Sequence, residues 1–138
     1  MMTAQQWAPP SGLDSELTQA GTQWDAVRAP AYFGDRVMEG LGDECGAVIR
    51  DPHAQRMYWL IRPGTAASWV FPGIAYVRVL GTASWVAVPP RDRVCSPGMH
   101  WAKPVTERSP LTSSAALYTA LSAVIADELG PRGAAAPS

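Results

Sequence analysis

Four side chains with metal-binding or nucleophilic chemistry are spread along the chain, at Cys45, His53, Cys95 and His100. Thiolate sulfur and imidazole nitrogen are the ligands that structural zinc sites use. The spacings do not match the short Cys-x-x-Cys pairs of such sites, so we predict no metal site and no cofactor. A Cys–His nucleophile pair is the alternative, although no third group to orient it is evident. Acid–base chemistry could be carried by Asp51, His53 or His100, but an aspartate before a proline is also a typical turn residue.

A second set of candidates lies just after the apolar run that ends at Pro89 and Pro90. Two prolines remove two backbone donors, so a sheet cannot continue through them and the chain must leave as a loop. Arg91 and Arg93 lie on that loop, and guanidinium groups on a protruding loop suit phosphate contacts. The alternative is a solvated loop in which these arginines pair with Asp92 or another neighbouring acid.

The chain has six tryptophans, which is many for one small core, so we expect one or two to lie at a binding surface. Trp69 and Trp101 are flanked by loop residues and are the candidates for a base-stacking surface beside the arginines. Trp59 and Trp85 lie deep in apolar runs and are predicted to be core residues. Packing in the sheet is the alternative for all four, because strands favour aromatic side chains.

Composition bounds the class of protein. The 138 residues are 47% hydrophobic and 17% charged, which fits one globular domain with a packed core. The net charge of −1 hides an asymmetry, because residues 1–49 hold two basic and seven acidic side chains whereas residues 50–108 hold eight basic and three acidic. A basic middle can bind phosphate or nucleic acid, or can complement the acidic part within one fold or across a homodimer. With no signal peptide or membrane span evident, a cytoplasmic protein with reduced cysteines is expected.

Hydrophobic periodicity predicts an α+β domain. Alternation predicts strands at 24–28, 47–49, 57–61, 75–81 and 83–89, with a short returning strand at 98–104. Helical periodicity and end signals predict helices at 31–41 and 113–129, each followed by a glycine. We therefore expect a mostly antiparallel sheet of about five strands with two packed helices, in a single domain over residues 22–129. Residues 1–21 are predicted to be a flexible arm and residues 130–138 a disordered tail.

The stretch from Arg78 to Pro104 resembles the end of the N-terminal catalytic domain of the bifunctional DNA primase/polymerase (Prim-Pol) family. The resemblance is carried by Gly81, Trp85-Val86-Ala87-Val88-Pro89-Pro90, Ser96-Pro97-Gly98 and His100-Trp101. "MYWLIRPG" resembles the strand of that family that ends in Arg-x-Pro, and "AVIRDPH" resembles its metal-binding strand. "WDAVRAPAYFGDRVMEGLG" is similar to small actinobacterial Prim-Pol-like proteins, so the likeness covers roughly residues 22–129, with the Pro-Pro segment its most specific part.

The departures from this family fall on its chemistry. Nucleotide transfer needs a pair of carboxylates to hold divalent cations, but Ile49 stands at the first acid position and only Asp51 is present at the second. The Gly-Arg-His that places a histidine on the triphosphate is Gln55-Arg56-Met57, which leaves Arg56 as a phosphate-binding candidate. Arg93 stands where the family has the histidine after Pro-Pro. The resemblance thus implies a polymerase-type framework, with 47–49 and 85–88 in one β-layer, that has lost its metal site.

Three functions follow as hypotheses. The first is a non-catalytic, regulatory Prim-Pol-like module that contacts nucleic acid or a protein partner through the basic loop and its tryptophans. The second is a small-molecule-binding protein or enzyme that grips an aromatic ligand with tryptophans. The third is a structural protein that dimerises through its oppositely charged parts.

Overall fold

The computed structural model describes residues 7–106 and 111–134, with the side chains described as far as residue 129. This part of the chain holds seven strands and two helices, with two strands before the first helix and five strands between the two helices. The strands are β1 (Glu16–Gln19), β2 (Asp25–Pro30), β3 (Val48–Asp51), β4 (Arg56–Ile61), β5 (Arg78–Leu80), β6 (Trp85–Val88) and β7 (His100–Lys103). The helices are α1 (Ala31–Leu41) and α2 (Ser114–Ala134), with short 3-10 turns at Gly42–Glu44 and Gly73–Ala75. The predicted α+β class is confirmed.

Five of the strands form one antiparallel sheet in the order β5-β2-β4-β3-β7. The β3–β4 hairpin forms as the sequence predicts, because the Asp51 carboxylate accepts hydrogen bonds from the backbone N–H groups of His53 and Ala54 at 3.1 and 3.2 Å. This is the local capping that aspartate provides in tight turns. The other three pairings of this sheet join strands far apart in the chain or separated by loops and a helix.

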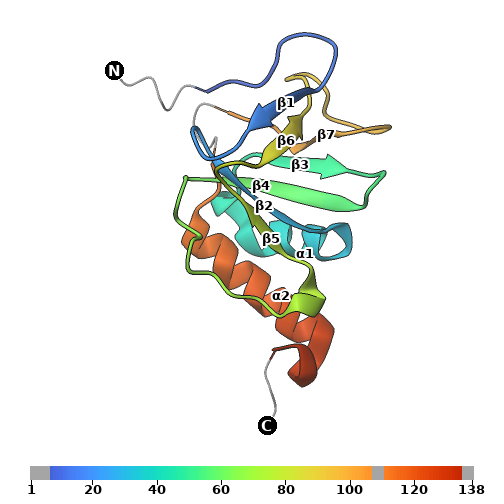
Figure 1. Ribbon diagram of the computed structural model, residues 1–138. Coiled ribbons are helices and arrows are strands. Elements are labelled where there is room, and N and C mark those ends of the chain that lie inside the picture. The colour runs from blue at the N-terminus through green and yellow to red at the C-terminus, as the bar shows by residue number, and fades with distance from the viewer. Residues whose placement is uncertain (1–6, 107–110, 135–138) are drawn as a thin grey trace.

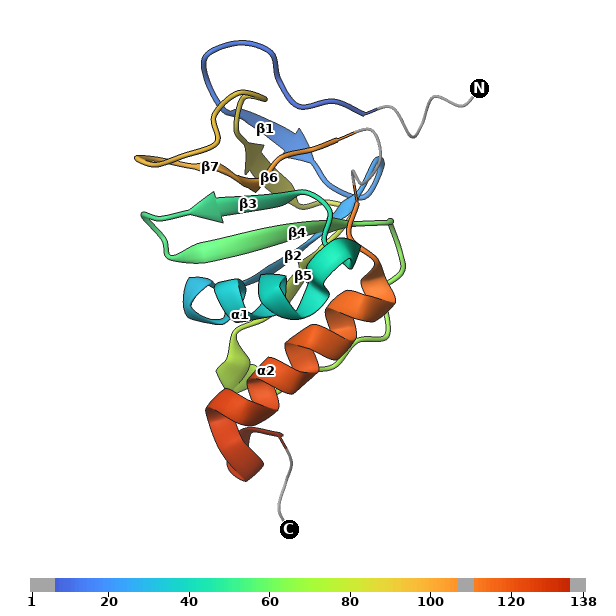
Figure 2. The same ribbon diagram turned by 180° about the vertical axis from the view of Figure 1, so that it is seen from behind.

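Both helices cover one face of this sheet (Figures 1 and 2). α1 buries Phe33, Val37 and Leu41, and α2 buries Leu117 and Leu121 against the same core. Gly34 allows α1 to lie close to β4, because a Cβ there would lie only 1.9 Å from the sulfur of Met57 and would force that side chain to move. The amphipathic stripes that predicted these helices are therefore the surfaces that hold them on the sheet.

A two-stranded ribbon of β1 and β6 covers part of the opposite face (Figure 1). Val86 and Val88 of the ribbon pack with Ile49, Leu60 and Trp101 in a second core cluster. The expectation that 47–49 and 85–88 share one β-layer is therefore wrong. Residues 81–84 turn sharply between β5 and β6, with Ala83 at φ 76° and the Ser84 N–H bonded to the Gly81 carbonyl, so β6 leaves the plane of the sheet.

The predicted flexible arm is also wrong over much of its length. Glu16–Gln19 pairs with β6 along four residues, and the Arg91 N–H donates to the Pro10 carbonyl at 2.9 Å. Trp7 packs edge-on against Trp24. These contacts are long-range and run largely through the backbone, so the local composition of residues 1–21 carries no sign of them.

At the other end, α2 runs through Gly130 and Pro131 to Ala134. The helix stop expected at Gly130 is wrong, and residues 130–134 of the expected tail are helical, whereas 135–138 lie outside the described residues. The Ser113 hydroxyl accepts a hydrogen bond from the Ala116 N–H at 3.2 Å and so caps the start of α2. In the described part of the chain, neither helix is both long enough and apolar enough to cross a bilayer.

Candidate functional site

Three arginines gather on the sheet face opposite the helices, where the ribbon does not reach. Arg28 of β2 stands directly across from Arg78 of β5 and from Tyr58 of β4, and Arg56 of β4 stands across from Pro30. Directly opposed residues in an antiparallel pair have Cβ atoms about 5 Å apart. We call the surface formed by Arg28, Arg56 and Arg78 the arginine face.

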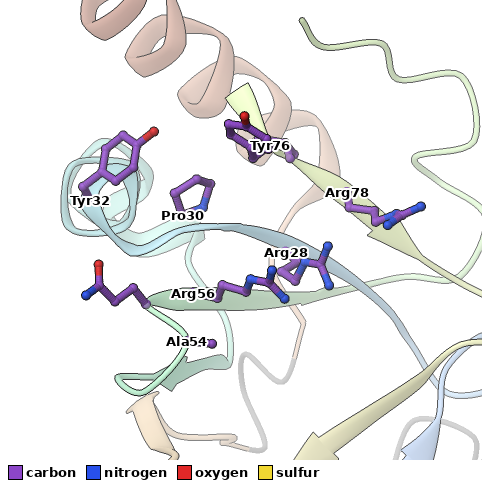
Figure 3. Close-up of a pocket in the computed structure, with 9 residues that line it drawn as sticks. Arg28, Pro30, Tyr32, Ala54, Arg56, Tyr76 and Arg78 are labelled. Atoms are coloured by element: carbon purple, nitrogen blue, oxygen red, sulfur yellow. The ribbon is translucent and has the colours of Figure 1, made fainter. Parts of the chain in front are cut away.

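A groove runs along the arginine face. One hollow of about 480 Å³ is lined by all three arginines together with Tyr32 and Tyr76 (Figure 3). A second hollow of about 580 Å³ shares Arg28 and Arg78 with the first and extends to Trp85 on β6. The shared arginines make the two hollows one open groove, which is bounded by tyrosines at one end and by a tryptophan at the other.

The positive charge of this groove is poorly compensated. Burial lowers the pKa of the Arg28 guanidinium from its ordinary value, and repulsion from Arg56 and Arg78 lowers it further, while a hydrogen bond with Tyr58 acts in the opposite sense. Among the described residues, no ion pair is found for any of these three arginines. Asp51 borders the groove and stands directly across from Arg56, but no ion pair joins the two side chains, and the Asp51 Oδ1 accepts the two turn N–H groups.

Two other arginines of the described chain have acidic partners, whereas no ion pair is found for Arg62, Arg91 or Arg93. Arg36 pairs with Asp127 and Glu128 of α2, which raises the pKa of its guanidinium, and Arg50 pairs with Asp35 at 3.1 Å. Like charges placed directly opposite each other across strands destabilise a sheet. The three arginines of the arginine face therefore repel one another, and a bound anion would relieve this repulsion. Arg36 and Arg50 are already neutralised by carboxylates and have no such need of an anion.

The aromatic side chains of the groove are open to solvent. Tyr32, Tyr76 and Trp85 are 61%, 71% and 58% exposed. Tyrosine and tryptophan combine an apolar ring with a polar group, and both are enriched at interfaces. Their faces are available for stacking against a planar group.

The groove is also where the backbone is strained. In the described part of the chain, three non-glycine residues have positive φ, namely Gln55 at 57°, Tyr76 at 57° and Ala83 at 76°. Gln55 and Tyr76 line the first hollow, and Ala83 precedes Ser84, which lines the second. Strain of this kind tends to collect at functional sites, because the conformation is maintained for a purpose other than stability.

The sequence-predicted basic loop does not form part of this site. Arg91 is exposed, and its backbone N–H bonds to Pro10. Arg93 is half-buried, and its guanidinium donates to the Leu13 carbonyl at 2.6 Å, so it fastens the N-terminal segment instead of projecting to solvent. Neither arginine lines the groove. Of the predicted phosphate-binding residues, Arg56 is the one that lies in it.

The tryptophan predictions are partly reversed. Trp101 is buried, and its indole N–H donates to the Pro89 carbonyl at 3.1 Å, so the alternative of packing in the sheet holds for it and the candidate binding position does not. Trp85 is exposed, so its predicted core position is wrong. The inner side of the ribbon packs on the sheet, and Trp85 lies on its outer side. Trp59 is fully buried, as predicted. Trp69 is half-buried within an aromatic cluster with Phe71 and Tyr118.

The cysteines and histidines do not converge. Cys45 is buried on the helix side of the sheet, where burial raises the pKa of its thiol. His53 is exposed in the β3–β4 turn, Cys95 is exposed in the loop after β6, and His100 is nearly buried, with Nδ1 2.9 Å from the Gly98 carbonyl oxygen. Among the described residues, no three His, Cys, Asp or Glu side chains lie together as a metal ion would need.

Sequence reasoning missed Arg28 and Arg78 as site residues. Each interrupts an alternating strand, Arg28 between Val27 and Ala29 and Arg78 between Val77 and Val79. This pattern places both side chains on the face away from the helices. The signal was therefore present in each strand, but their proximity depends on β2 and β5 being neighbours.

Comparison of the chain with protein-family models, curated proteins and solved structures yields no match.

Proposed function

We propose that this protein is a non-catalytic module that binds single-stranded nucleic acid along the arginine face. The observation that carries the proposal is the alignment of Arg28, Arg56 and Arg78 on three adjacent strands without an acidic partner among the described residues. Guanidinium groups bind phosphate oxygens through paired, charge-assisted hydrogen bonds. A row of them suits a phosphate backbone better than a single anion.

The aromatic side chains support a single-stranded ligand. Proteins that bind single strands combine a positive groove with rings on which bases stack. Tyr32 and Tyr76 stand at one end of the arginines and Trp85 at the other, all exposed. The open, shallow form of the groove gives no enclosure for a lone mononucleotide, whereas a strand can lie along it.

The environment of Asp51 supports a non-catalytic role. The Prim-Pol resemblance, which we retain as part of the proposal, would put the cation site at Ile49 and Asp51. Ile49 is fully buried and contributes no ligand oxygen, and Asp51 is engaged in capping its turn. The separate placement of β6 counts against a conserved polymerase framework, so the proposal depends on the arginine face and not on the family.

The direct test is fluorescence anisotropy with a labelled single-stranded DNA or RNA of about twelve nucleotides at low salt. We expect Arg28→Gln and Arg56→Gln each to weaken binding by about tenfold, because each removes a charge-assisted contact. Arg91→Gln is the matched control, since it removes the same charge from the loop and should change affinity little. Absence of binding by the intact protein, or a loss in Arg91→Gln with none in Arg28→Gln, would contradict the proposal.

A further inference from the structure

A third cavity lies beside β5, on the helix side of the sheet. Its volume is about 580 Å³, within the range of pockets that take small ligands. Its lining includes Asp25 from β2, Trp69 and Phe71 from the β4–β5 connection, and Gly81 just after β5. Arg78 also borders it, but Val77 and Val79 pack in the helix-side core, so the Arg78 side chain alternates to the arginine face.

Asp25 is a buried carboxylate with an incomplete set of partners. Its side chain belongs to a residue that is only 7% exposed, and its Oδ2 accepts one hydrogen bond from the Gly64 N–H at 2.8 Å. No ion pair and no other hydrogen bond to this carboxylate is found among the described residues. The Oδ1 atom has no hydrogen-bond partner among the described residues, and Asp25 lines the cavity. The cavity therefore presents a carboxylate that can accept a donor from a bound cation.

Gly81 keeps that carboxylate accessible. A Cβ at this position would lie 3.5 Å from Oδ1 and 3.6 Å from Oδ2 of Asp25. The backbone of Gly81 is not in the left-handed region that favours glycine, so conformation does not require glycine here. What the missing side chain provides is open space over the carboxylate.

The opposite wall is aromatic and firmly held. The rings of Trp69 and Phe71 lie edge to face, with centroids 6.0 Å apart and planes at 86°. Tyr118 of α2 packs against both, at 5.2 and 5.3 Å. Aromatic faces attract organic cations and provide apolar contact at small entropic cost, because the rings are already fixed.

We propose that this cavity binds a small organic amine, with the ammonium group on Asp25 and the apolar body against Trp69 and Phe71. The amine supplies the positive charge that the carboxylate lacks, and the rings select for an apolar substituent. This site is distinct from the arginine face, which repels cations and lies on the other side of β2. The proposal is independent of nucleic-acid binding.

Three probes of one shape and different charge test it: phenethylamine, phenethyl alcohol and hydrocinnamate. Binding is followed by tryptophan fluorescence and by the NMR shift of the Gly64 amide, which donates to Asp25. We expect the amine to bind at least about tenfold more tightly than the alcohol, and the carboxylate not to bind. Equal binding of amine and alcohol, or no binding of the amine, would overturn the proposal.

Two variants locate the site. Asp25→Asn keeps an oxygen for the Gly64 N–H but removes the charge, so the preference for the amine over the alcohol should disappear. Gly81→Leu removes no polar group and fills the space over the carboxylate, so it should abolish amine binding while the protein remains folded by circular dichroism. Unchanged amine affinity in a folded Gly81→Leu protein would also overturn the proposal, even if Asp25→Asn did not fold. Arg56→Gln, on the arginine face, is the control and should bind the amine as the parent does.

Discussion

The sheet face opposite the helices has two halves that are built from the same strands. In the covered half, Ala26 of β2, Leu60 of β4 and Leu80 of β5 lie near the ribbon in an apolar core. Two residues further along or back on each strand, the same face carries Arg28, Tyr58 and Arg78. On each of these three strands, a step of two residues therefore leads from the apolar core to the groove.

This difference shows that the ribbon decides what the sheet face does. Where β6 packs on the sheet, apolar side chains are buried and stabilise the fold. Where it does not, the same strands carry unpaired positive charges that contribute repulsion instead. The covered half stabilises the fold, whereas the like charges of the open half destabilise it until an anion binds. Substitutions should therefore lower the free energy of unfolding in the covered half and raise it in the open half.

The largest expected effect is in the covered half. Trp101→Ala removes a fully buried ring and leaves a cavity, so it should lower the free energy of unfolding by about 3–5 kcal/mol. Chemical denaturation monitored by circular dichroism measures this loss. Trp85→Ala is the matched control, because it removes the same ring from an exposed site and should change stability by less than about 0.5 kcal/mol. Similar losses in both variants would erase the distinction between the halves.

The same Trp85→Ala protein should be impaired in binding. Loss of one stacking ring is expected to weaken single-strand affinity by about 1–3 kcal/mol. Anisotropy titration checks this, with Trp85→Phe expected to recover part of the affinity because it restores an aromatic face. An unchanged affinity in Trp85→Ala would confine the interface to the tyrosine end of the groove.

A smaller effect is expected where the N-terminal segment is fastened over the ribbon. Arg93→Ala removes the hydrogen bond to the Leu13 carbonyl and should lower stability by about 1 kcal/mol. Arg91→Ala leaves its own backbone contact to Pro10 in place, so it should have almost no effect. Limited proteolysis of residues 7–15 should accelerate in Arg93→Ala alone; equal cleavage of the two variants would count against this role of Arg93.

The smallest effect, in the opposite direction, is expected in the open half. Arg78→Gln removes a like charge directly across from Arg28, so it should raise the free energy of unfolding by roughly 0.2–0.5 kcal/mol. The gain should shrink as salt is added, because salt screens exposed charges. Thermal unfolding at low and high salt measures it, and a loss of stability would show that Arg78 serves packing.

Local pattern was sufficient to predict most of the elements. The stripe of Leu117 and Leu121 predicted α2, and the turn at Asp51 predicted the β3–β4 hairpin, because each signal lies within one short window. The partner of β6 could not be predicted, since it is the segment around Leu17, which is polar and distant in the chain. Backbone pairing of that kind leaves no trace in hydrophobic periodicity.

The candidate site was predictable in its chemistry and not in its location. A basic, aromatic surface was expected, and Arg56 was among its predicted residues, but the expected loop is used for fastening at Arg93. Arg28 and Arg78 meet only through strand register, and Trp85 is exposed because no described segment covers the outer side of the ribbon. Each of these depends on long-range pairing that no single segment contains.

Pairing of β1 with β6 also determines how short the protein can be made. A chain starting at residue 22 would retain all five strands of the main sheet and both helices. However, β6 would lose β1, the strand that forms hydrogen bonds with its backbone. A solitary strand with free N–H and C=O groups invites another polypeptide to take the vacated place. Trimming the N-terminus to the apparent domain boundary would thus be expected to make the protein prone to aggregate.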